Sequence, residues 1–366
     1  MSVKVLNVIT GGLGREGITT TQLEFMKGMD KSEIQMDIAA VHDNEEDVIS
    51  EFEATGCRVM RFPDRKRELL AYMKQLNHRI RREHYDVIHV HGSSSMMSIE
   101  LLIAKFAGVK TRIAHSRNTR ADHEKVDKLL RPVFDHCYTH AFSCGEDAGK
   151  WLFGDKEFTV LHNGKNLEKF HFYQEQRDSI RTKYAIGNKT AVGFVGNLNV
   201  QKNLPFLLDV IRHNNISNPD CIYFLMGDGP ERENVRAKLE EYGLSDNVIM
   251  TGRIPNIPEM LQGMDVMLLP SLFEGLPNVV LEWQAAGLPS LISDQITQEC
   301  KVSNLVKFLP INQGTEIWVK EIEKVSINND RKTYSEDACR CMKAAGFDLE
   351  ENIEFVRKFY VEAAQR

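Results

Sequence analysis

The chain has 366 residues, of which 42% are hydrophobic and 27% are charged. This length exceeds what one hydrophobic core usually supports, so we expect two domains of about 180 residues each. The composition excludes a largely disordered or low-complexity chain, and the net charge of −6 argues against nucleic acid as a partner.

The first apolar run, at residues 3–10, leads into the glycine-rich sequence TGGLGREGITT. Because the run is too short for a signal peptide or a membrane span, we expect a first buried strand. Gly12, Gly14 and Gly17 fit the G-x-G-x-x-G pattern, in which backbone amides and a helix N-terminus near Ile18 would face a pyrophosphate. No acidic residue stands clearly at the end of the second strand, so a plain tight turn is an equal interpretation.

The stretch from Arg58 to Arg131 is basic, with 17 Lys and Arg residues against 8 Asp and Glu residues. The stretch should therefore present a basic face, which could meet an anionic membrane surface or a phosphate-bearing substrate, or could simply be solvated. A stripe of apolar residues within residues 65–84 fits either a helix on a membrane surface or an ordinary crossover helix. The stripe consists of Leu69, Leu70, Met73, Leu76 and Ile80.

Short apolar, β-branched runs alternate with stretches of helical periodicity along the whole chain. This alternation predicts an α/β fold with two Rossmann-like, doubly wound domains that face each other across a cleft. The polar segment near residues 171–189 contains no buried strand, so we place the boundary there, with domains over residues 1–175 and 185–345. Ligands of such sheets bind beyond the carboxyl ends of the strands. The predicted strands lie at residues 3–10, 36–41, 57–62, 86–92, 112–116, 141–145, 158–164, 191–196, 221–227, 247–252, 265–271, 289–294 and 306–310.

A second glycine-containing loop, GNLNVQKN at residues 196–203, follows the first strand of the second domain. Glycine permits close backbone approach, and a lysine at the mouth of a helix is a compact cation suited to the charge of a leaving diphosphate. We therefore take Lys202 as a candidate, against the alternative of an exposed lysine that starts a surface helix.

The most specific segment is PSLFEGLPNVVLEWQAAGLPSL at residues 270–291. Pro277 suits the first position of a helix, so the preceding amides should favour a phosphate. Glu274 in the loop and Glu282 on the helix are eight residues apart, at most about 12 Å along a helix, which suits the two polyol ends of a nucleotide-sugar. Alternatively, Glu274 is only a dipole partner of the helix and Glu282 a surface residue.

Residues 350–366 carry Ile353, Val356, Phe359 and Tyr360 at helical spacing, which predicts an amphipathic C-terminal helix. The seven cysteines show no repeated spacing, which favours a reduced, cytoplasmic compartment. No D-x-D pair occurs, and the pairs His89/His91 and Cys339/Cys341 lack further ligands, so we expect no metal site.

The E-x7-E segment resembles the signature of retaining glycosyltransferases of family 4, which have two Rossmann-like domains in the GT-B arrangement. The resemblance covers nearly the whole chain and includes DVIHVHGS, RIAHS, HNG followed by Phe170, VGNLNVQKN, FLMGDGP, VIMTGR and GFDLEENIEFVRKFY in the family's order. The pattern is most like that of bacterial capsular and exopolysaccharide enzymes.

The resemblance implies a role for each motif. Glu274 would contact the hydroxyls of the donor sugar, Glu282 would bind the ribose, and Lys202 would neutralise the diphosphate. His115 would lie near the reacting centre, so the catalytic set is His115, Lys202 and Glu274. The other implied donor-binding positions are Gly12, Gly14, Gly196, Asn197, Gly227, Arg253, Gly275, Leu276, Pro277 and Asn278.

The implied activity is transfer of a hexose-type sugar, with retention, from a UDP-sugar to a saccharide or lipid-linked saccharide, without a metal or other cofactor. We expect a cytoplasmic enzyme, peripheral at the inner face of the cell membrane if the basic face meets lipid, whose residues 346–366 pack back on the first domain. The chain departs from the family where Asn197 replaces an arginine, Arg117 a histidine, and Lys165 and Asn166 an isoleucine and an aspartate. A nucleotide-sugar epimerase and a non-catalytic partner subunit remain alternatives, and a dehydrogenase is a distant one.

Overall fold

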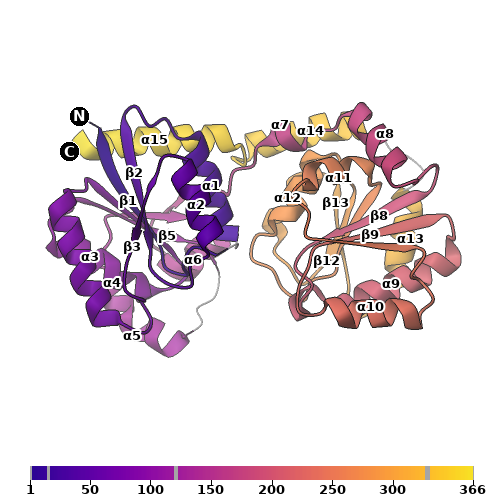
Figure 1. The fold of residues 1–366 in the computed structure, drawn as a ribbon, viewed down its shortest axis with the longest axis horizontal. Coiled ribbons are helices and arrows are strands. Elements are labelled where there is room, and N and C mark those ends of the chain that lie inside the picture. Colours follow the sequence, from indigo (N-terminus) through magenta and orange to yellow (C-terminus); the bar gives the residue numbers. More distant parts are fainter. Residues whose placement is uncertain (1, 15–16, 119–122, 326–329, 366) are drawn as a thin grey trace. The chain divides into compact units, whose positions relative to one another are not determined.

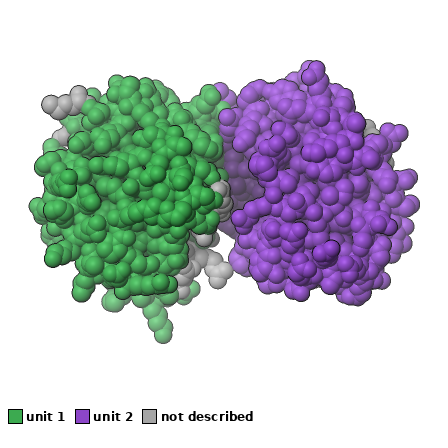
Figure 2. Space-filling model, viewed as in Figure 1, with its two compact units in different colours: residues 1–164, 346–366 green, residues 165–345 purple. Residues whose placement is uncertain are grey.

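The structure is a computed structural model that describes residues 2–14, 17–118, 123–325 and 330–365. The chain forms two compact units, shown in green and purple in Figure 2. Unit 1 comprises residues 1–164 and 346–366, and unit 2 comprises residues 165–345. Every apolar run that was predicted as a strand forms one, so the predicted α/β class is confirmed.

Unit 1 is built on a parallel sheet with the strand order β3-β2-β1-β4-β5-β6-β7. Successive side chains of a strand point to opposite faces, and both faces are covered by helices, which is why the strands read as continuous apolar runs. Val5, Val87 and Ile113 pack with α1 and α15 on one face, whereas Leu6 and Ile88 pack with α3 and α4 on the other (Figure 1). The strands are β1 (Val3–Ile9), β2 (Ile34–Ala40), β3 (Arg58–Arg61), β4 (Val87–Gly92), β5 (Thr111–Ser116), β6 (His140–Ser143) and β7 (Thr159–Val160). The helices are α1 (Gly17–Gly28), α2 (Glu46–Ala54), α3 (Leu69–Glu83), η1 (Ser95–Met97), α4 (Ser98–Phe106), α5 (Glu124–Phe134), α6 (Glu146–Phe153) and α15 (Leu349–Gln365).

Unit 2 repeats the same plan with the strand order β10-β9-β8-β11-β12-β13. Helices α9, α10 and α13 gather on one face of this sheet, and α11, α12 and α14 on the other (Figure 1). The strands are β8 (Thr190–Val195), β9 (Cys221–Met226), β10 (Val248–Gly252), β11 (Val266–Leu269), β12 (Ser290–Ser293) and β13 (Val306–Leu309). The helices are α7 (Leu167–Phe170), α8 (Gln174–Lys183), η2 (Val200–Lys202), α9 (Leu204–Ser217), α10 (Arg232–Glu241), α11 (Ile257–Gly263), α12 (Asn278–Ala285), η3 (Gln298–Cys300), α13 (Glu316–Val325) and α14 (Arg331–Ala344).

The two units divide after Gly164, earlier than the predicted boundary near residues 171–189. The polar segment that we read as a linker forms α8, whose Arg177 and Arg181 both bind the Asp265 carboxylate at the start of β11. The backbone N–H of Phe172 also donates to Ser335 Oγ of α14 at 3.0 Å. Because these polar side chains make specific contacts within unit 2, the absence of a buried strand did not mark a linker.

The C-terminal helix α15 belongs to unit 1. Its Ile353, Val356 and Tyr360 are buried against the sheet, and Phe359 packs beside them. In α3, Leu76 and Ile80 of the predicted apolar stripe are buried with Tyr72, whereas Leu70 is 82% exposed. The stripe is therefore in large part the sheet-facing side of a crossover helix. Among the described residues, no helix combines the length and the apolar character that crossing a membrane requires.

Candidate active site

The sheet of unit 2 reverses its strand order between β8 and β11. From β8 the chain continues to β9 on one side, and from β11 it continues to β12 on the other. The loops that follow these two strands therefore diverge, and the crevice between them is where open α/β sheets bind ligands. Both motifs of the second half, at residues 196–203 and 270–277, lie at this point of the sheet.

Lys202 and Glu274 meet at the carboxyl edge of this sheet. The Lys202 ammonium pairs with Glu274 Oε1, which also accepts a hydrogen bond from Ser271 Oγ at 2.9 Å. Gln201 Nε2 donates to Glu274 Oε2 at 3.0 Å, so both oxygens of the carboxylate are held. The side chains of Lys202 and Glu274 are only 13% and 11% exposed. The structure therefore joins the two motifs into one cluster of charged and polar side chains.

The loop after β8 holds Lys202 in a single tight turn. The side-chain oxygen of Asn199 accepts a hydrogen bond from the Lys202 N–H at 3.3 Å, and Asn203 adopts the left-handed conformation with φ +52° before α9 begins. The carbonyl of Gln201 accepts from the N–H of Leu272 at 2.8 Å, which ties this loop to the loop after β11. Local hydrogen bonds thus fix the backbone at Lys202, and Glu274 holds its ammonium.

Glu282 lies on α12, and its Oε1 pairs with the ammonium of Lys165 at 2.7 Å. The two side chains are 17% and 13% exposed, so the pair is partly shielded from solvent. Lys165 is one of the departures from the family pattern, and the sequence had given it no role. The predicted positions of Glu274 in a loop and Glu282 on a helix are both observed.

The segment before α12 differs from the prediction in one detail. The helix begins at Asn278, so Pro277 occupies the cap position and not the first helical position. Pro277 has φ −72° and ψ 100°, extended rather than helical, because the chain turns only at Asn278. Gly275 and Leu276 precede this turn, and Asn278 Oδ1 is buried without a hydrogen-bond partner among the described residues.

Gly227, directly after β9, is required by backbone packing, whereas a Cβ atom at Gly196 would meet only side chains. Gly227 has φ +146°, and a Cβ atom there would lie 1.9 Å from the carbonyl oxygen of Gly196. Asn197 is exposed, and Arg253, which follows β10, is exposed as well. No contact between Arg253 and the Lys202–Glu274 cluster is seen in the described part of the chain, so its place in a donor site stays a prediction.

In unit 1, the glycine loop follows β1, which together with β4 marks the point where that sheet reverses its order. Gly12 has φ +95°, and a Cβ atom there would lie 1.7 Å from the carbonyl oxygen of His42. A tight turn therefore accounts for Gly12 by itself, and the roles of Gly12 and Gly14 toward a donor stay predictions. Residues 15 and 16 of the loop lie outside the described residues.

His115 is the last but one residue of β5 and lies within a stack of three buried histidines. Its Nδ1 lies 3.0 Å from Nε2 of His89, and the rings of His91 and His115 have centroids 5.2 Å apart. Burial lowers the pKa of all three imidazoles well below the usual value, and the nearby Arg117 cation lowers the pKa further. The three side chains are therefore neutral at pH 7.

Because these histidines are buried as neutral groups, the free energy of unfolding should depend on pH. The unfolded chain binds a proton on each histidine near pH 6.5 while the folded chain does not, so stability is complete above pH 6.5 and falls as the pH decreases below it. Three such groups predict a loss of about 4 kcal/mol between pH 7.5 and 5.5 in the transition of unit 1. Urea titrations at both pH values measure it.

The matched controls for this prediction are two single variants. His91→Gln should reduce the loss by about one third, because one of the three buried groups no longer titrates. His78→Gln, at an exposed position of α3, should leave the loss unchanged. Equal stability of the wild type at the two pH values would contradict the prediction.

Two family models match the chain. The model described as glycosyl transferases group 1 matches residues 176–336, and the model described as glycosyl transferase 4-like domain matches residues 16–144. The chain is a glycosyltransferase. It therefore has the GT-B fold of two Rossmann-like domains, and the predicted transferase class is confirmed.

Relatives of this glycosyltransferase, and solved structures of other proteins with a similar fold, agree with the assignment. The chain is 28% identical to EpsF of Bacillus subtilis (strain 168), over 98% of this chain and 96% of that protein. It is 25% identical to the UDP-Gal:alpha-D-GlcNAc-diphosphoundecaprenol alpha-1,3-galactosyltransferase of Escherichia coli, over 85% of this chain and 83% of that enzyme. The Anabaena protein Alr3699/HepE, solved with UDP, superimposes with a TM-score of 0.82 at 13% identity, covering 98% of this chain and all of that one.

Three site residues of the glycosyltransferase were missed by the sequence reading. Gln201 and Ser271 hold the Glu274 carboxylate, and Lys165 holds the Glu282 carboxylate. Gln201 stands next to Lys202, and Ser271 stands three residues before Glu274, so proximity in sequence was an available signal for both. Lys165 is 117 residues away from Glu282, and nothing in the sequence signals their contact.

Two groups of side chains in unit 1 of the glycosyltransferase have metal-ligating chemistry. Each group places its ligand atoms within 4.8 Å of one another, and the groups are His89/His91/His115 and His42/Asp43/Asp64. The first adds His115 from a neighbouring strand to the pair noticed in the sequence. In the second, the two ring nitrogens of His42 are each paired with one carboxylate. These contacts account for the second group, whereas His115 Nε2 of the first group has no hydrogen-bond partner among the described residues.

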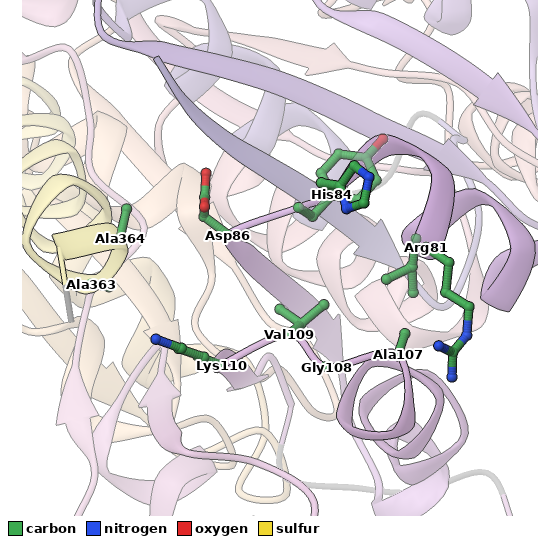
Figure 3. Close-up of a pocket in the computed structure, with 11 residues that line it drawn as sticks. Arg81, His84, Asp86, Ala107, Gly108, Val109, Lys110, Ala363 and Ala364 are labelled. Atoms are coloured by element: carbon green, nitrogen blue, oxygen red, sulfur yellow. The ribbon is translucent and has the colours of Figure 1, made fainter. Parts of the chain in front are cut away.

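A separate pocket lies at the opposite edge of the unit 1 sheet (Figure 3). Asp86 and Lys110, which precede β4 and β5, line it together with Arg81 of α3 and Ala363 of α15. Asp86 accepts a hydrogen bond from the Lys4 N–H, and Arg81 donates to the carbonyl oxygen of Phe106. Because it lies at the amino ends of the strands and its charged groups have structural partners, the pocket is not a candidate active site.

Proposed function

We propose that this glycosyltransferase moves a hexose-type sugar from a UDP-sugar to a saccharide or lipid-linked saccharide, with retention of configuration, in the synthesis of a surface polysaccharide. The observation that carries the proposal is the cluster of Lys202, Glu274, Gln201 and Ser271 at the point where the unit 2 sheet reverses its strand order. Support for the donor comes from the Escherichia coli relative, named for UDP-Gal, and from HepE structures solved in complex with UDP and with UDP-glucose.

The arrangement suits binding and charge stabilisation better than acid–base chemistry. Both oxygens of Glu274 accept hydrogen bonds, so in our proposal this carboxylate orients sugar hydroxyls and is not a nucleophile. The Lys202 ammonium has three N–H donors and can bind a diphosphate oxygen while it keeps its contact with Glu274. The departing phosphate, on the same face as the acceptor, would accept the acceptor's proton. Positioning and a fixed cation then supply most of the rate enhancement.

The test of this proposal is a thermal-shift and calorimetric panel of UDP-, GDP- and ADP-sugars on the full chain. A bound ligand raises apparent stability by mass action, so the UDP-sugars should raise the melting temperature and the others should not. If no nucleotide-sugar bound, the proposal would be wrong. Isomerisation of the free nucleotide-sugar would favour an epimerase, and binding without transfer or hydrolysis under any acceptor condition would favour a non-catalytic partner subunit.

Replacement of Glu282 by glutamine is expected to weaken donor binding with little effect on turnover. The amide keeps the shape of the side chain but loses the charge that accepts from ribose hydroxyls, so the KM for the UDP-sugar should rise about 10-fold. Steady-state kinetics with varied donor measure this change. Glu259→Gln, on exposed surface of α11, is the matched control and should leave KM unchanged. A fall in kcat with an unchanged KM would contradict a ribose-binding role.

We also propose that the reaction needs no divalent metal ion or other cofactor. The sequence has no D-x-D pair to hold an ion against a diphosphate, and Lys202 already places a cation beside Glu274. Transfer rates measured with excess EDTA should equal those measured with Mg²⁺ or Mn²⁺. A rate that collapsed on chelation and returned with one of these ions would refute metal independence.

For the acceptor side, we propose that the enzyme is cytoplasmic and that unit 1 meets an anionic membrane surface through α5. This helix exposes Val126, Leu129 and Val133 at helical spacing, with Leu129 77% exposed, and Lys125 and Lys128 are exposed between them. Apolar side chains flanked by lysines suit the interface of an anionic bilayer.

The membrane proposal predicts that Leu129→Ser reduces co-sedimentation with vesicles that contain phosphatidylglycerol by about 5-fold, because partial burial of one leucine side chain contributes about 1 kcal/mol. Ile216→Ser on α9 of unit 2, which is 72% exposed, is the control and should not change binding. Co-sedimentation that did not depend on the anionic lipid content would argue against the proposal.

A further inference from the structure

Arg117 lies directly after β5, at the carboxyl edge of the unit 1 sheet. Its backbone N–H donates to the carbonyl oxygen of Gly92 at 3.0 Å, which continues the parallel ladder between β4 and β5. Residues two apart on a strand share a face, so Arg117 and His115 lie on the same side of the sheet. Arg117 as a residue is neither fully buried nor fully exposed, so part of it reaches solvent at this edge.

The guanidinium of Arg117 has only neutral partners. Its Nη1 donates to Asn163 Oδ1 at 2.8 Å, and its Nε and Nη2 both approach His91 Nδ1, at 3.3 and 3.0 Å. Three of its five N–H donors are directed to these atoms, which leaves two. No carboxylate among the described residues pairs with it, and burial lowers the pKa of Arg117 to about 10.

Two buried arginines with a purely structural role have partners of a different kind from those of Arg117. Arg65 of unit 1 forms a two-point ion pair with Glu100, at 2.6 and 3.2 Å. Arg331 of unit 2 is surrounded by the carbonyl oxygens of Leu261, Met264 and Ala286. Arg117 has neither a counter-ion nor a set of carbonyl oxygens, so its charge is uncompensated within the described structure. An isolated charge in such a place is costly unless an anion pairs with it.

The contact with Arg117 also fixes the tautomer of His91. An arginine can only donate, so His91 Nδ1 must accept and its proton resides on Nε2. That N–H then donates to Asn7 Oδ1, which lies 3.2 Å away on β1. The guanidinium is thus held by the neutral imidazole of His91, both of whose ring nitrogens are hydrogen-bonded. A metal ion bound to the histidines would lie next to the Arg117 cation.

His115 offers a second unpaired group on the same face. Its Nε2 is buried and has no hydrogen-bond partner among the described residues. Tyr360 of α15 lies with its hydroxyl 2.6 Å from His89 Nδ1, and His89 Nε2 lies 3.0 Å from His115 Nδ1. When the tyrosine hydroxyl donates to His89 Nδ1, the proton of His89 resides on Nε2 and is donated to His115 Nδ1. The proton of His115 then resides on Nε2, which presents an N–H group.

We propose that the Arg117 guanidinium and the Nε2–H of His115 form an anion-binding site at the carboxyl edge of unit 1 that takes the diphosphate group of a substrate. Arginine binds phosphate oxygens through two N–H groups at once, and two are unused here. A diphosphate occurs in a nucleoside diphosphate and in a lipid-linked diphosphate acceptor. The anion-binding site itself is argued from Arg117 and His115, and only the choice of these two substrates rests on the proposed function.

The experiment is calorimetric titration of the full chain with inorganic pyrophosphate, UDP and a short-chain prenyl diphosphate. Arg117→Gln should weaken binding of at least one organic diphosphate by roughly 10–100-fold, since a charged hydrogen bond is lost and each 1.4 kcal/mol is tenfold. The diphosphate affinity of Arg117→Lys should lie between those of the wild type and Arg117→Gln, because lysine keeps the charge but cannot form the two-point contact. Arg82→Gln removes the same charge from an exposed position of α3 and should change nothing.

Asn163→Asp is the decisive variant, because it keeps the shape of the side chain and leaves Arg117 in place. The new carboxylate would pair with Nη1 across the present 2.8 Å contact and act as an internal counter-ion. Diphosphate affinity should fall by at least 10-fold while the melting temperature of the free protein rises. A merely structural Arg117 predicts unchanged affinity in this variant.

The two sources of diphosphate are separated by which titration changes. A loss confined to the prenyl diphosphate assigns the site to the acceptor, and a loss confined to UDP assigns it to the donor. Unchanged affinity for pyrophosphate, UDP and prenyl diphosphate in both Arg117→Gln and Asn163→Asp would overturn the inference. Donor binding by the wild type, read in the same UDP-sugar titrations, tests the proposed function separately.

Discussion

Replacement of Lys202 by alanine is expected to lower the turnover of sugar transfer by about 100-fold or more, the usual effect of losing one preorganised group that stabilises a developing charge. The ammonium pairs with Glu274 beside the tight turn at residues 199–203, so its position is fixed before a donor binds. If Lys202 binds the diphosphate as we propose, Asn197 in place of the arginine of the family pattern would leave Lys202 with a larger share of the diphosphate charge.

The measurement is kcat for transfer, or for donor hydrolysis when no acceptor is supplied. Lys189→Ala is the matched control, because Lys189 is an exposed lysine of the same unit just before β8. Loss of the ammonium also leaves Glu274 without its counter-charge, so donor binding should weaken in parallel. Activity of Lys202→Ala within a few-fold of the wild type would show that the diphosphate charge is met elsewhere.

Replacement of Gly227 by alanine is expected to lower the free energy of unfolding of unit 2 by about 3–5 kcal/mol, from backbone strain and overpacking together. Gly227 has φ +146°, and the added methyl group would meet the carbonyl oxygen of Gly196 at 1.9 Å, so backbone would have to move. The N–H of Gly227 also donates to the carbonyl oxygen of Gly252 at 3.0 Å, which couples the ends of β9 and β10.

Urea unfolding, followed separately for the two units, measures this loss. Gly11→Ala is the control, because a Cβ atom there meets nothing within 4 Å, and its effect should stay within about 0.5 kcal/mol. An unfolding free energy for Gly227→Ala close to that of the wild type would mean that the strand ends adjust easily. Any loss of donor binding in Gly227→Ala should then be assigned to packing before it is assigned to direct contact with a ligand.

The two units have corresponding strand orders, but different kinds of side chain lie at the carboxyl edges of their sheets. Unit 2 has two lysine–carboxylate pairs among its candidate donor-site residues, Lys202 with Glu274 and Lys165 with Glu282. In unit 1 the carboxyl edge gathers neutral histidines and one arginine that has no counter-ion among the described residues. The parallel ladder brings these residues together, because the carboxyl ends of all its strands lie at one edge.

The sequence by itself determined the α/β class, the positions of the strands and the identity of Lys202, Glu274 and Glu282 as candidates. Each of these depends on local pattern: apolar runs of strand length, glycine after a strand, and two carboxylates at a fixed spacing around a helix start. The predicted boundary near residues 171–189 lies later than the division after Gly164, because α8 contacts Asp265 of unit 2 through arginines that no local pattern pairs with it.

Only the tertiary structure decided which side chains hold one another. The contacts of Glu282 with Lys165, of His89 with Tyr360 and of Arg117 with Asn163 join residues that are 117, 271 and 46 positions apart. Such pairs depend on strand order, on register and on where a C-terminal helix docks, and all three are set by packing of the whole sheet. For this reason the sequence supplied the candidates for a donor site, whereas the uncompensated charge of Arg117 became visible only once its neighbours were in place.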